Sequence, residues 1–320
     1  MQGGAFNSDL AVRKLMRQVI RKLEQPQSFW ELLAVTNAPI EILAQALHQL
    51  LDESLIRRHG PKFARTGPAP KDPDFSTLTK EMQSICRQRP RPDTVYDQGP
   101  IWPELTVERV KTIFNCGDLE GANLLILGDD DLVGIAAAMT GLPNRVTVLE
   151  IDPRLVEFIS QTSSAYNLNL EVRLYDAQKE LPSDLDSQFT LAVTDPVETK
   201  AGFKLFLSRC AQALVGPGAA LYLGLTSVES SVQRWYDLER AILQAGFAIT
   251  MVIPQFHRYT LPSASFVAQE YPEAADLIGP PPPADLPWYT SSLLRLEAVK
   301  ELCPPYVGPV TLGKLLYRDR

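Results

Sequence analysis

Leu124-Leu-Ile-Leu-Gly-Asp-Asp-Asp-Leu-Val-Gly-Ile-Ala-Ala-Ala-Met139 is the stretch that decides the fold. Its first four residues are uninterruptedly apolar, which predicts a fully buried strand of a parallel sheet. Gly128 ends that strand, and the small residues from Leu132 to Met139 predict a helix. A strand, a glycine turn and a helix in this order open a nucleotide-binding βαβ unit.

Three carboxylates occupy the turn of this unit. Such a turn usually reads Gly-x-Gly-x-x-Gly, so that backbone amides can hold a pyrophosphate. Asp129, Asp130 and Asp131 stand there instead, and they would repel a phosphate while attracting a cation. Together with Gly128, they predict a binding segment for an adenosine compound that carries a positive centre and no phosphate. Sulfonium compounds of the S-adenosyl type meet these conditions.

Strand and helix patterns alternate on both sides of this unit. They predict an α/β fold over residues 94–320, a Rossmann-like, doubly wound sheet with an irregular C-terminal region. The further strands are expected at 145–152, 170–176, 189–195, 219–226, 247–253 and 291–299. Helices are expected at 106–115, 153–167, 200–214 and 230–244, and irregular chain at 261–287.

Residues 1–66 predict a separate winged-helix domain, followed by a linker over 67–93 with one short helix near 78–87. Ser28 and Glu31 have the spacing of a capping box at the start of its second helix. Residues 55–66 read as two short strands around a Gly-Pro turn, the wing.

The third helix of this domain, over 40–54, would read DNA in a DNA-binding winged helix. It carries Glu41, Asp52 and Glu53 and no lysine or arginine. A dimerisation or acceptor-shielding module is therefore favoured over a DNA reader.

The charge of the chain is concentrated near the candidate site. The net charge is −7 overall, but residues 97–200 hold 18 acidic and seven basic residues, a net of −11. An acidic cleft raises the local concentration of cations. The four cysteines form no CxxC pair and no zinc spacing, so no metal is expected and a reducing cytoplasm is the expected location. No leader peptide and no membrane-spanning run are expected.

Acidic residues follow four of the expected strands, where a doubly wound sheet binds its ligands. Glu150 lies about 22 residues past Gly128, near the spacing of an acid that binds ribose hydroxyls. Asp152 points the same way and is a second candidate for that role. Asp176 is expected to take the adenine amino group, and Asp195 to stand beside the reacting centre. Any one of these acids alone would be an ordinary helix cap.

Asp195-Pro-Val-Glu198 predicts the catalytic segment. Pro196 stiffens the turn, so that Asp195 can accept a proton from an ammonium nucleophile. Glu198 is expected to hold a second charge of the same substrate, while a helix N-terminus is the structural alternative for both acids. Tyr259 is expected to cover the site, and His257 is not expected to be the base.

Six segments together resemble the branched-chain polyamine synthases, or N4-bis(aminopropyl)spermidine synthases. They read Leu-Gly-Asp-Asp-Asp-Leu (127–132), Val-Leu-Glu-Ile-Asp (148–152), Tyr-Asp (175–176), Asp-Pro-x-Glu-Thr (195–199), Leu-Phe-Leu-Ser-Arg (205–209) and Tyr-x-Gly-Leu-Thr (222–226). Val197 replaces the second proline of the family's Asp-Pro-Pro-Glu motif, which loosens the turn and leaves the choice of acceptor open.

The resemblance implies the fold of class I methyltransferases and aminopropyl transfer from decarboxylated S-adenosylmethionine, as cosubstrate, to the secondary amine of spermidine. It implies that Asp195 is catalytic with Glu198 beside it, and that the protein is a homodimer without a tightly bound cofactor. Asp97, Asp130, Glu198 and Tyr259 are then expected to bind the acceptor.

Two other functions remain open on the sequence. The first is an amino-group methyltransferase that acts on nucleic acid, whose motif would carry an aromatic residue where Glu198 stands. The acidic surroundings also disfavour a phosphate backbone, so nucleic acid is not the expected partner. The second is a regulator without catalytic activity, with a winged helix on DNA and a sensory domain that binds a polyamine or nucleoside.

Overall fold

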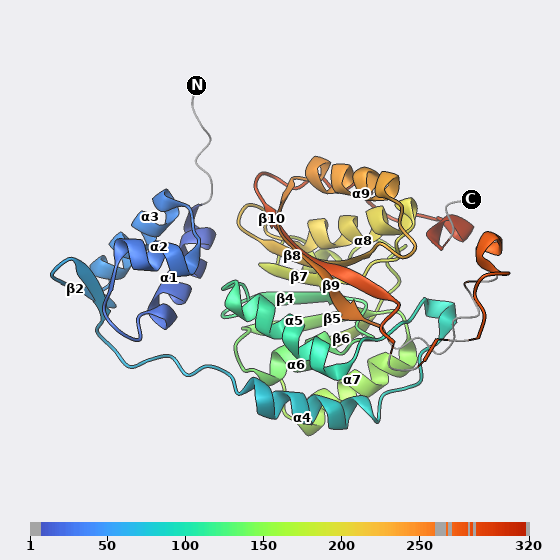
Figure 1. The fold of residues 1–320 in the computed structure, drawn as a ribbon, viewed down its shortest axis with the longest axis horizontal. Helices are drawn as coiled ribbons and strands as arrows, with labels where there is room; N and C mark the ends of the chain where they lie inside the picture. The colour runs from blue at the N-terminus through green and yellow to red at the C-terminus, as the bar shows by residue number, and fades with distance from the viewer. Residues whose placement is uncertain (1–7, 260–266, 268–270, 281, 284–285, 318–320) are drawn as a thin grey trace.

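The computed structural model describes residues 8–259, 267, 271–280, 282–283 and 286–317 (Figure 1). Its larger part is built on strands β4 (Asn123–Leu127), β5 (Arg145–Glu150), β6 (Leu170–Leu174), β7 (Leu191–Thr194), β8 (Ala220–Thr226), β9 (Phe247–Arg258) and β10 (Thr290–Ala298). Within the described chain they form one sheet in the order β6-β5-β4-β7-β8-β10-β9. The pairings among β4 to β8 are parallel, and β10 runs antiparallel to both β8 and β9. The predicted α/β fold with a mostly parallel central sheet is confirmed.

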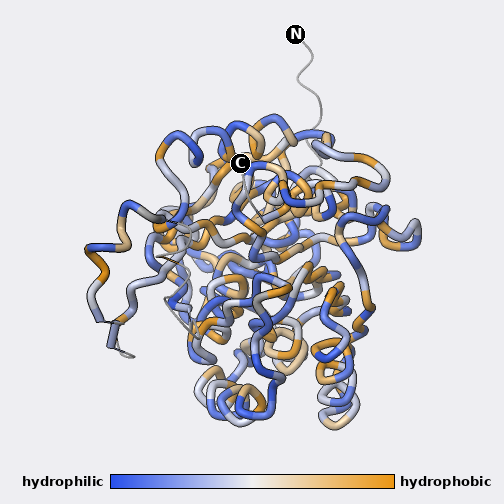
Figure 2. Tube along the Cα trace, turned by 90° about the vertical axis from the view of Figure 1, so that its right-hand side faces the viewer, coloured by the Kyte–Doolittle hydropathy of each residue, from blue (hydrophilic) through white to orange (hydrophobic). Residues whose placement is uncertain are grey.

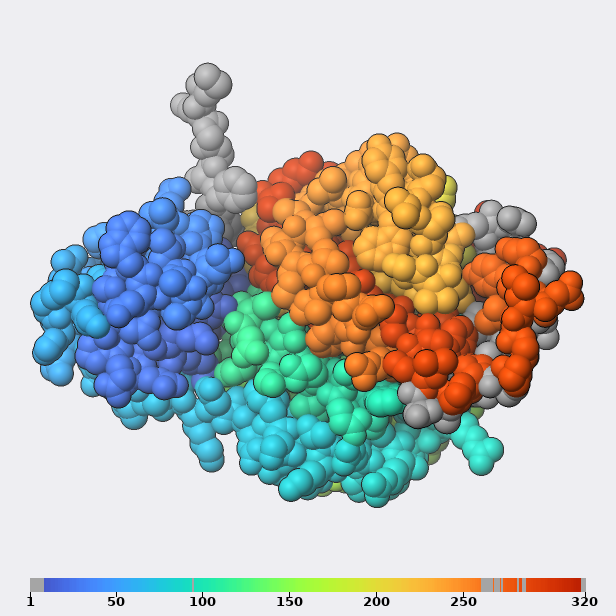
Figure 3. All heavy atoms as spheres, in the orientation of Figure 1, coloured from blue at the N-terminus to red at the C-terminus, as the bar shows by residue number. Residues whose placement is uncertain are grey.

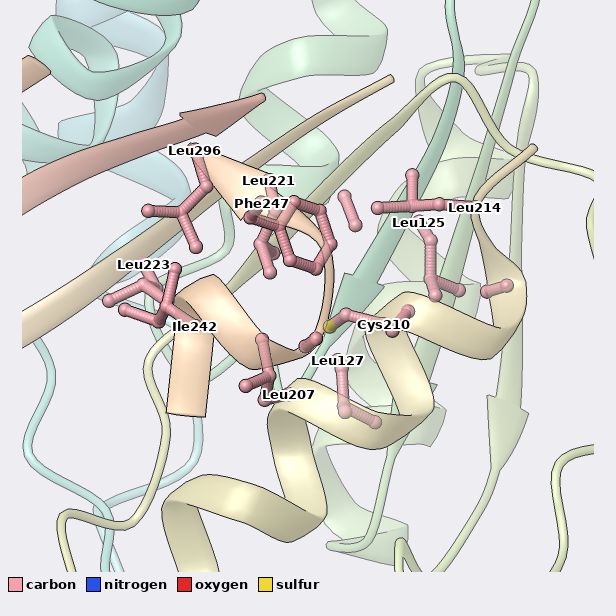
Figure 4. Packing of buried hydrophobic residues seen from close by; sticks show 14 of the residues in the cluster. Leu125, Leu127, Leu207, Cys210, Leu214, Leu221, Leu223, Ile242, Phe247 and Leu296 are labelled. Atoms are coloured by element: carbon pink, nitrogen blue, oxygen red, sulfur yellow. The ribbon is translucent and has the colours of Figure 1, made fainter. Parts of the chain in front are cut away.

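Helices cover both faces of this sheet. They are α4 (Phe75–Cys86), α5 (Pro103–Asn115), α6 (Val133–Met139) and α7 (Pro153–Ala165) on one face, and α8 (Lys200–Ala213) and α9 (Val232–Gln244) on the other. Figure 4 shows the second face, where leucines of β4 and β8 pack against Cys210, Leu207 and Ile242. In Figure 2 hydrophobic and hydrophilic residues alternate along the helices, as expected for helices with one buried side.

The strand order places a switch point beside β4. The chain builds β5 and β6 outward on one side of β4, then returns to build β7 and β8 on the other. At such a point the loops after neighbouring strands diverge and leave a crevice at the carboxyl ends of the strands. The acid-bearing turn after β4 and the Asp195 segment after β7 stand on either side of it.

The end of β9 differs from the prediction in a way that shapes the site. Pro254 suggests a strand end at residue 253, but β9 is an edge strand, where proline is tolerated, and it continues to Arg258. Gln255 has a positive φ of 52°, and the pairing with β10 shifts register in this region. This bulge carries the strand past the proline and brings His257 and Tyr259 to the crevice.

The helix expected near 78–87 begins earlier and has a larger role than a linker helix. α4 begins at Phe75, and Leu78, Met82 and Ile85 are buried in the same core as β4 and α5. Several other bounds also differ by a few residues from the prediction: for example, β5 ends at Glu150, β6 ends at Leu174, and α5 begins at Pro103. The stretch predicted as irregular, 261–287, lies largely outside the described residues.

The N-terminal unit has its own small core. It consists of α1 (Ser8–Lys22), β1 (Gln27–Ser28), α2 (Phe29–Thr36), α3 (Ile40–Asp52), β2 (Ile56–His59) and β3 (Lys62–Arg65), with the sheet order β1-β3-β2. The predicted capping box is present: the Glu31 amide donates to Ser28 Oγ, and the Ser28 amide donates to Glu31 Oε2 at 2.6 Å. In the part of the chain that the structure describes, none of the helices has the length and apolarity that a bilayer crossing needs.

Candidate active site

The turn after β4 holds its three aspartates in three different ways. Asp129 is buried, and its carboxylate accepts the Val133 and Gly134 amides at 2.6 and 3.0 Å, so it caps α6. Asp131 is also buried. Its carboxylate accepts a hydrogen bond from the Ile101 amide at 2.8 Å and forms an ion pair with Arg109 at 3.0 Å. The carboxylates of Asp129 and Asp131 are therefore already bound by groups of the protein itself.

Asp130 is the most exposed of the three aspartates. Its Oδ2 accepts a hydrogen bond from the Gly99 amide at 3.1 Å, and the residue is half-buried. Burial raises the pKa of Asp130 well above its ordinary value, and the nearby charges of Asp131, Glu150 and Asp195 raise it further. These mutual effects show that the acids predicted from separate strand ends lie together. A cation that enters among them would relieve their repulsion.

The two acids at the end of β5 face different partners. Glu150 accepts the Asp129 amide at 2.7 Å and the Asp152 amide at 2.9 Å, and burial raises its pKa. Asp152 caps α7, and it is held by Arg154 and by the Gln98 amide group at 3.0 Å. Glu150 thus lies beside the turn, whereas Asp152 ties the helix to the segment that precedes α5.

Gly128 and Asp176 stand at the same edge. Gly128 has a φ of +74°, a conformation that favours glycine, and its amide donates to Leu149 O at 2.8 Å. Asp176 follows β6 and accepts the Gln178 amide at 2.9 Å. Asp176 and Asp97 both raise the pKa of Tyr317, after burial, so these two acids face the same tyrosine from different parts of the chain.

Asp195 lies just past the end of β7, and Tyr259 and Arg109 contact its carboxylate. Its Oδ2 accepts the Tyr259 hydroxyl at 2.6 Å, and Arg109 Nη2 lies 3.8 Å away. Burial raises the pKa of Asp195 to about 6, although Arg109 opposes the rise. A carboxylate with this pKa is ionised at neutral pH and close enough to it to accept a proton readily.

Glu198 holds the loop after β8. It accepts the Thr226 amide at 2.6 Å and the Ser230 hydroxyl at 2.8 Å, and burial raises its pKa to about 8. The loop that it holds carries Glu229, which the sequence analysis did not select. The charge of Glu229 raises the pKa of Glu198 and of Tyr289, so Glu229 faces the same acidic cluster.

The structure also adds groups to the site that no motif pointed to. Arg109 on α5 lies among the acids, His257 and Ser291 lie behind Tyr259, and Gly224 on β8 lies against Asp195. No sequence motif marks Arg109 on its helix or Ser291 on its strand, because their hydrogen-bond partners come from distant parts of the chain. Gly224 is the exception, since a glycine inside an apolar strand suggests a close approach.

The described residues contain no group of three or more histidine, cysteine, aspartate or glutamate side chains arranged to hold a metal ion. What the site offers is negative charge, one buried arginine and hydroxyl donors. This combination suits a ligand that is cationic and hydrogen-bonding.

Comparison with known proteins decides the family. The model of the branched-chain polyamine synthase A C-terminal domain matches residues 77–320. The chain belongs to the branched-chain polyamine synthase family. This confirms the resemblance drawn from the motifs.

The relatives in this family cover most of the chain. An N(4)-bis(aminopropyl)spermidine synthase of Thermus thermophilus is 34% identical in an alignment of 302 residues that covers 89% of this chain and 87% of that protein. One of Thermococcus kodakarensis is 35% identical over 247 residues, 77% of this chain and 69% of that protein. The crystal structure of the Thermus thermophilus branched-chain polyamine synthase contains N4-aminopropylspermidine and 5'-methylthioadenosine. It has a TM-score of 0.69 at 32% identity, covering 94% of this chain and 91% of that one.

Proposed function

We propose that this protein is an aminopropyltransferase that uses decarboxylated S-adenosylmethionine and a polyamine. The proposed acceptor nitrogen is the secondary amine of spermidine, and the proposed products are branched N4-bis(aminopropyl)spermidine and methylthioadenosine. The observation that carries the proposal is the cluster of acids around Asp195 at the switch point of the sheet. Family membership and the ligands of the Thermus thermophilus relative support it.

The chemistry matches the charges of the site. The acceptor nitrogen attacks the carbon next to the sulfonium, the C–S bond breaks, and its electron pair leaves on sulfur as a neutral thioether. One proton must leave the acceptor nitrogen before it can attack. In this proposal Asp195 takes that proton, and the remaining rate enhancement comes from holding the two cationic substrates in line.

The other acids divide into two groups in this proposal. Asp130 and Glu150, with Asp176, bind the cosubstrate, with Glu150 on the ribose and Asp176 on the adenine, and Asp130 and Asp97 also attract the acceptor. Asp129, Asp131 and Asp152 act mainly by positioning, because Asp129 caps α6 and arginines pair with Asp131 and Asp152. Glu198 places the loop that carries Glu229.

We further propose that the N-terminal unit is a winged helix that acts in dimer formation rather than on DNA. Its element order and its three-stranded antiparallel sheet support this. Its α3 carries Glu41 and Asp52 and no lysine or arginine, and Glu53 follows directly. A homodimer in a reducing cytoplasm fits the four free cysteines.

The test is incubation of the protein with decarboxylated S-adenosylmethionine and a panel of polyamines, with products identified by mass spectrometry. We expect one or two aminopropyl additions to spermidine and release of methylthioadenosine. Asp195→Asn should retain binding of methylthioadenosine and lose turnover by roughly 10²–10⁴-fold. Unchanged turnover in that variant would remove Asp195 from the mechanism, and methyl transfer in place of aminopropyl transfer would refute the proposed reaction.

A further inference from the structure

A continuous line of hydrogen bonds runs from Arg109 to Asp195 behind the site. Arg109 Nε donates to His257 Nε2 at 2.9 Å, and His257 Nδ1 lies 2.8 Å from Ser291 Oγ. Ser291 Oγ lies 2.8 Å from the Tyr259 hydroxyl, which is 2.6 Å from Asp195 Oδ2. The members come from α5, β9, β10 and the loop after β7, and Arg109, His257 and Ser291 are at most 2% exposed.

The first bond of this line fixes the state of the histidine. A guanidinium group can only donate, so His257 Nε2 must accept and carries no proton. The proton of the neutral imidazole is therefore on Nδ1. Burial holds the pKa of His257 well below its ordinary value, and the adjacent charge of Arg109 lowers it further, which agrees with a neutral ring.

The direction of the remaining bonds follows from that one. His257 Nδ1–H donates to Ser291, so the serine proton is free to point at the Tyr259 oxygen, and the tyrosine proton then points at Asp195. We propose that Arg109, His257, Ser291 and Tyr259 form a one-way hydrogen-bond relay that commits Asp195 Oδ2 as an acceptor and leaves Oδ1 to receive the proton of the substrate. The relay rests on the proposed role of Asp195 as the base.

The relay also favours the ionised form of Asp195. A hydroxyl donates more strongly to a carboxylate than to a neutral carboxyl group, so the hydrogen bond from Tyr259 lowers the pKa of Asp195. The four residues are thus positioning residues, because they act on the substrate through Asp195.

Other groups around Asp195 act on its ionisation as well. Arg109 on α5 and the Tyr259 hydroxyl lower its pKa, while Asp131 raises it, all after the larger effect of burial. The remaining ionisable groups that face it are Asp130, Glu198 and Tyr289. Because none of these three belongs to the relay, variants within the relay change one contribution while the others stay in place.

The first test reads the histidine directly. Nitrogen NMR of the ¹⁵N-histidine-labelled protein should show His257 neutral and protonated on Nδ1 from about pH 6 to pH 8, with exposed His48 and His59 as reference signals. This measurement needs no substrate, so it is independent of the proposed reaction. A ring protonated on Nε2, or an imidazolium in this range, would overturn the relay.

The second test reads the other end of the relay. Tyr259→Phe removes the proton that Asp195 accepts, so kcat should fall roughly 10- to 100-fold while the KM for the acceptor changes little. The acidic limb of kcat/KM, expected near pH 6 from Asp195, should move to higher pH. A raised KM with an unmoved limb would instead make Tyr259 an acceptor-binding residue.

The middle of the relay has a matched control on the same strand. Ser291→Ala should shift the acidic limb in the same direction as Tyr259→Phe, by a smaller amount, whereas Ser292→Ala, on the opposite face of β10, should leave it in place. If both serine variants behave alike, the relay is wrong although Asp195 remains the base. If Asp195→Asn retains its turnover, the proposed function itself fails.

Discussion

A single missing side-chain carbon makes room for the base. A Cβ placed on Gly224 would overlap Asp195 Oδ1 and lie 3.0 Å from its Cγ. Gly224 has neither a positive φ nor a turn position, so its backbone would accept an alanine. The reason for glycine at this position is the space that it leaves for the carboxylate.

We expect Gly224→Ala to push Asp195 out of place and to lower kcat by roughly 10²-fold, because an ångström of misplacement has such an effect on transfer reactions. The folded state should survive, since β8 keeps its ladder on both sides. Gly67→Ala is the control, because nothing lies within 4 Å of a Cβ at that position. Full activity of Gly224→Ala, measured by methylthioadenosine release, would contradict the packing of Asp195 against β8.

The residues that could be predicted are those whose chemistry is local. Asp195 follows a buried strand and precedes a proline, and Glu150 has the spacing of a ribose-binding acid, so each was predicted from its own segment. Which oxygens of Asp131 are engaged could not be predicted, because its donors are the Ile101 amide and Arg109, which belong to another segment. The same holds for Arg109, whose partners lie up to 148 residues away.

At the scale of elements, the apolar runs predicted the strands well, and the ends of the elements were less accurate. β4, β5, β7 and β8 are almost wholly buried, so each was visible as a largely apolar run, whereas β6 lies at the edge of the sheet and carries exposed charged residues. β9 was cut short in the prediction because its bulge at Pro254 and Gln255 resembles a strand end. α4 was read as part of a linker, since its neighbours are prolines, although its apolar side packs in the core.

The turn between β4 and α6 yields a prediction about the different roles of Asp129 and Asp130. Asp129→Asn leaves one N–H of α6 without its acceptor, so it should lower the free energy of unfolding by about 1–2 kcal/mol. The KM for both substrates should then stay within about threefold. Asp130→Asn should leave unfolding almost unchanged but raise the KM for the polyamine roughly tenfold, because it removes a carboxyl group that can ionise beside the cationic acceptor.

Thermal unfolding and steady-state kinetics of the two variants test whether Asp129 acts on stability and Asp130 on acceptor binding. Each variant serves as the control for the other, since both change one carboxylate oxygen to an amide nitrogen in adjacent positions. A rise in the KM for decarboxylated S-adenosylmethionine in Asp129→Asn without any loss of stability would assign Asp129 a direct contact with the cosubstrate.

At the scale of the whole molecule, one buried ion cluster joins the N-terminal unit to the sheet. Lys14 on α1 pairs with Asp118 at 2.6 Å and donates to Gly218 O at 2.7 Å. Arg295 on β10 and the Tyr222 hydroxyl on β8 reach the same carboxylate, each at 2.7 Å. In Figure 3 the N-terminal unit rests directly against the larger part of the molecule. The junction is thus built from α1 and three segments of the sheet.

The ion cluster makes the attachment of the N-terminal unit testable. Although burial opposes ionisation of Asp118, Lys14 and Arg295 hold its pKa below its ordinary value, so its carboxylate stays charged near neutral pH. Lys14→Met leaves that buried charge with Arg295 alone and should lower the free energy of unfolding by roughly 3 kcal/mol. Lys22→Met, on the exposed end of the same helix, should change it by less than about 0.5 kcal/mol.

The same variant separates stability from catalysis. The ion cluster around Asp118 contains none of the acids at the carboxyl ends of β4, β5 and β7. At a temperature where Lys14→Met is folded, its kcat should therefore remain within about twofold of the kcat of the unchanged protein. Limited proteolysis should then release the N-terminal unit faster from Lys14→Met than from Lys22→Met, because cleavage follows local opening. Equal rates of release would mean that the contacts of α1 other than Lys14, including those of Arg17 and Arg21 with Glu120, hold the junction by themselves.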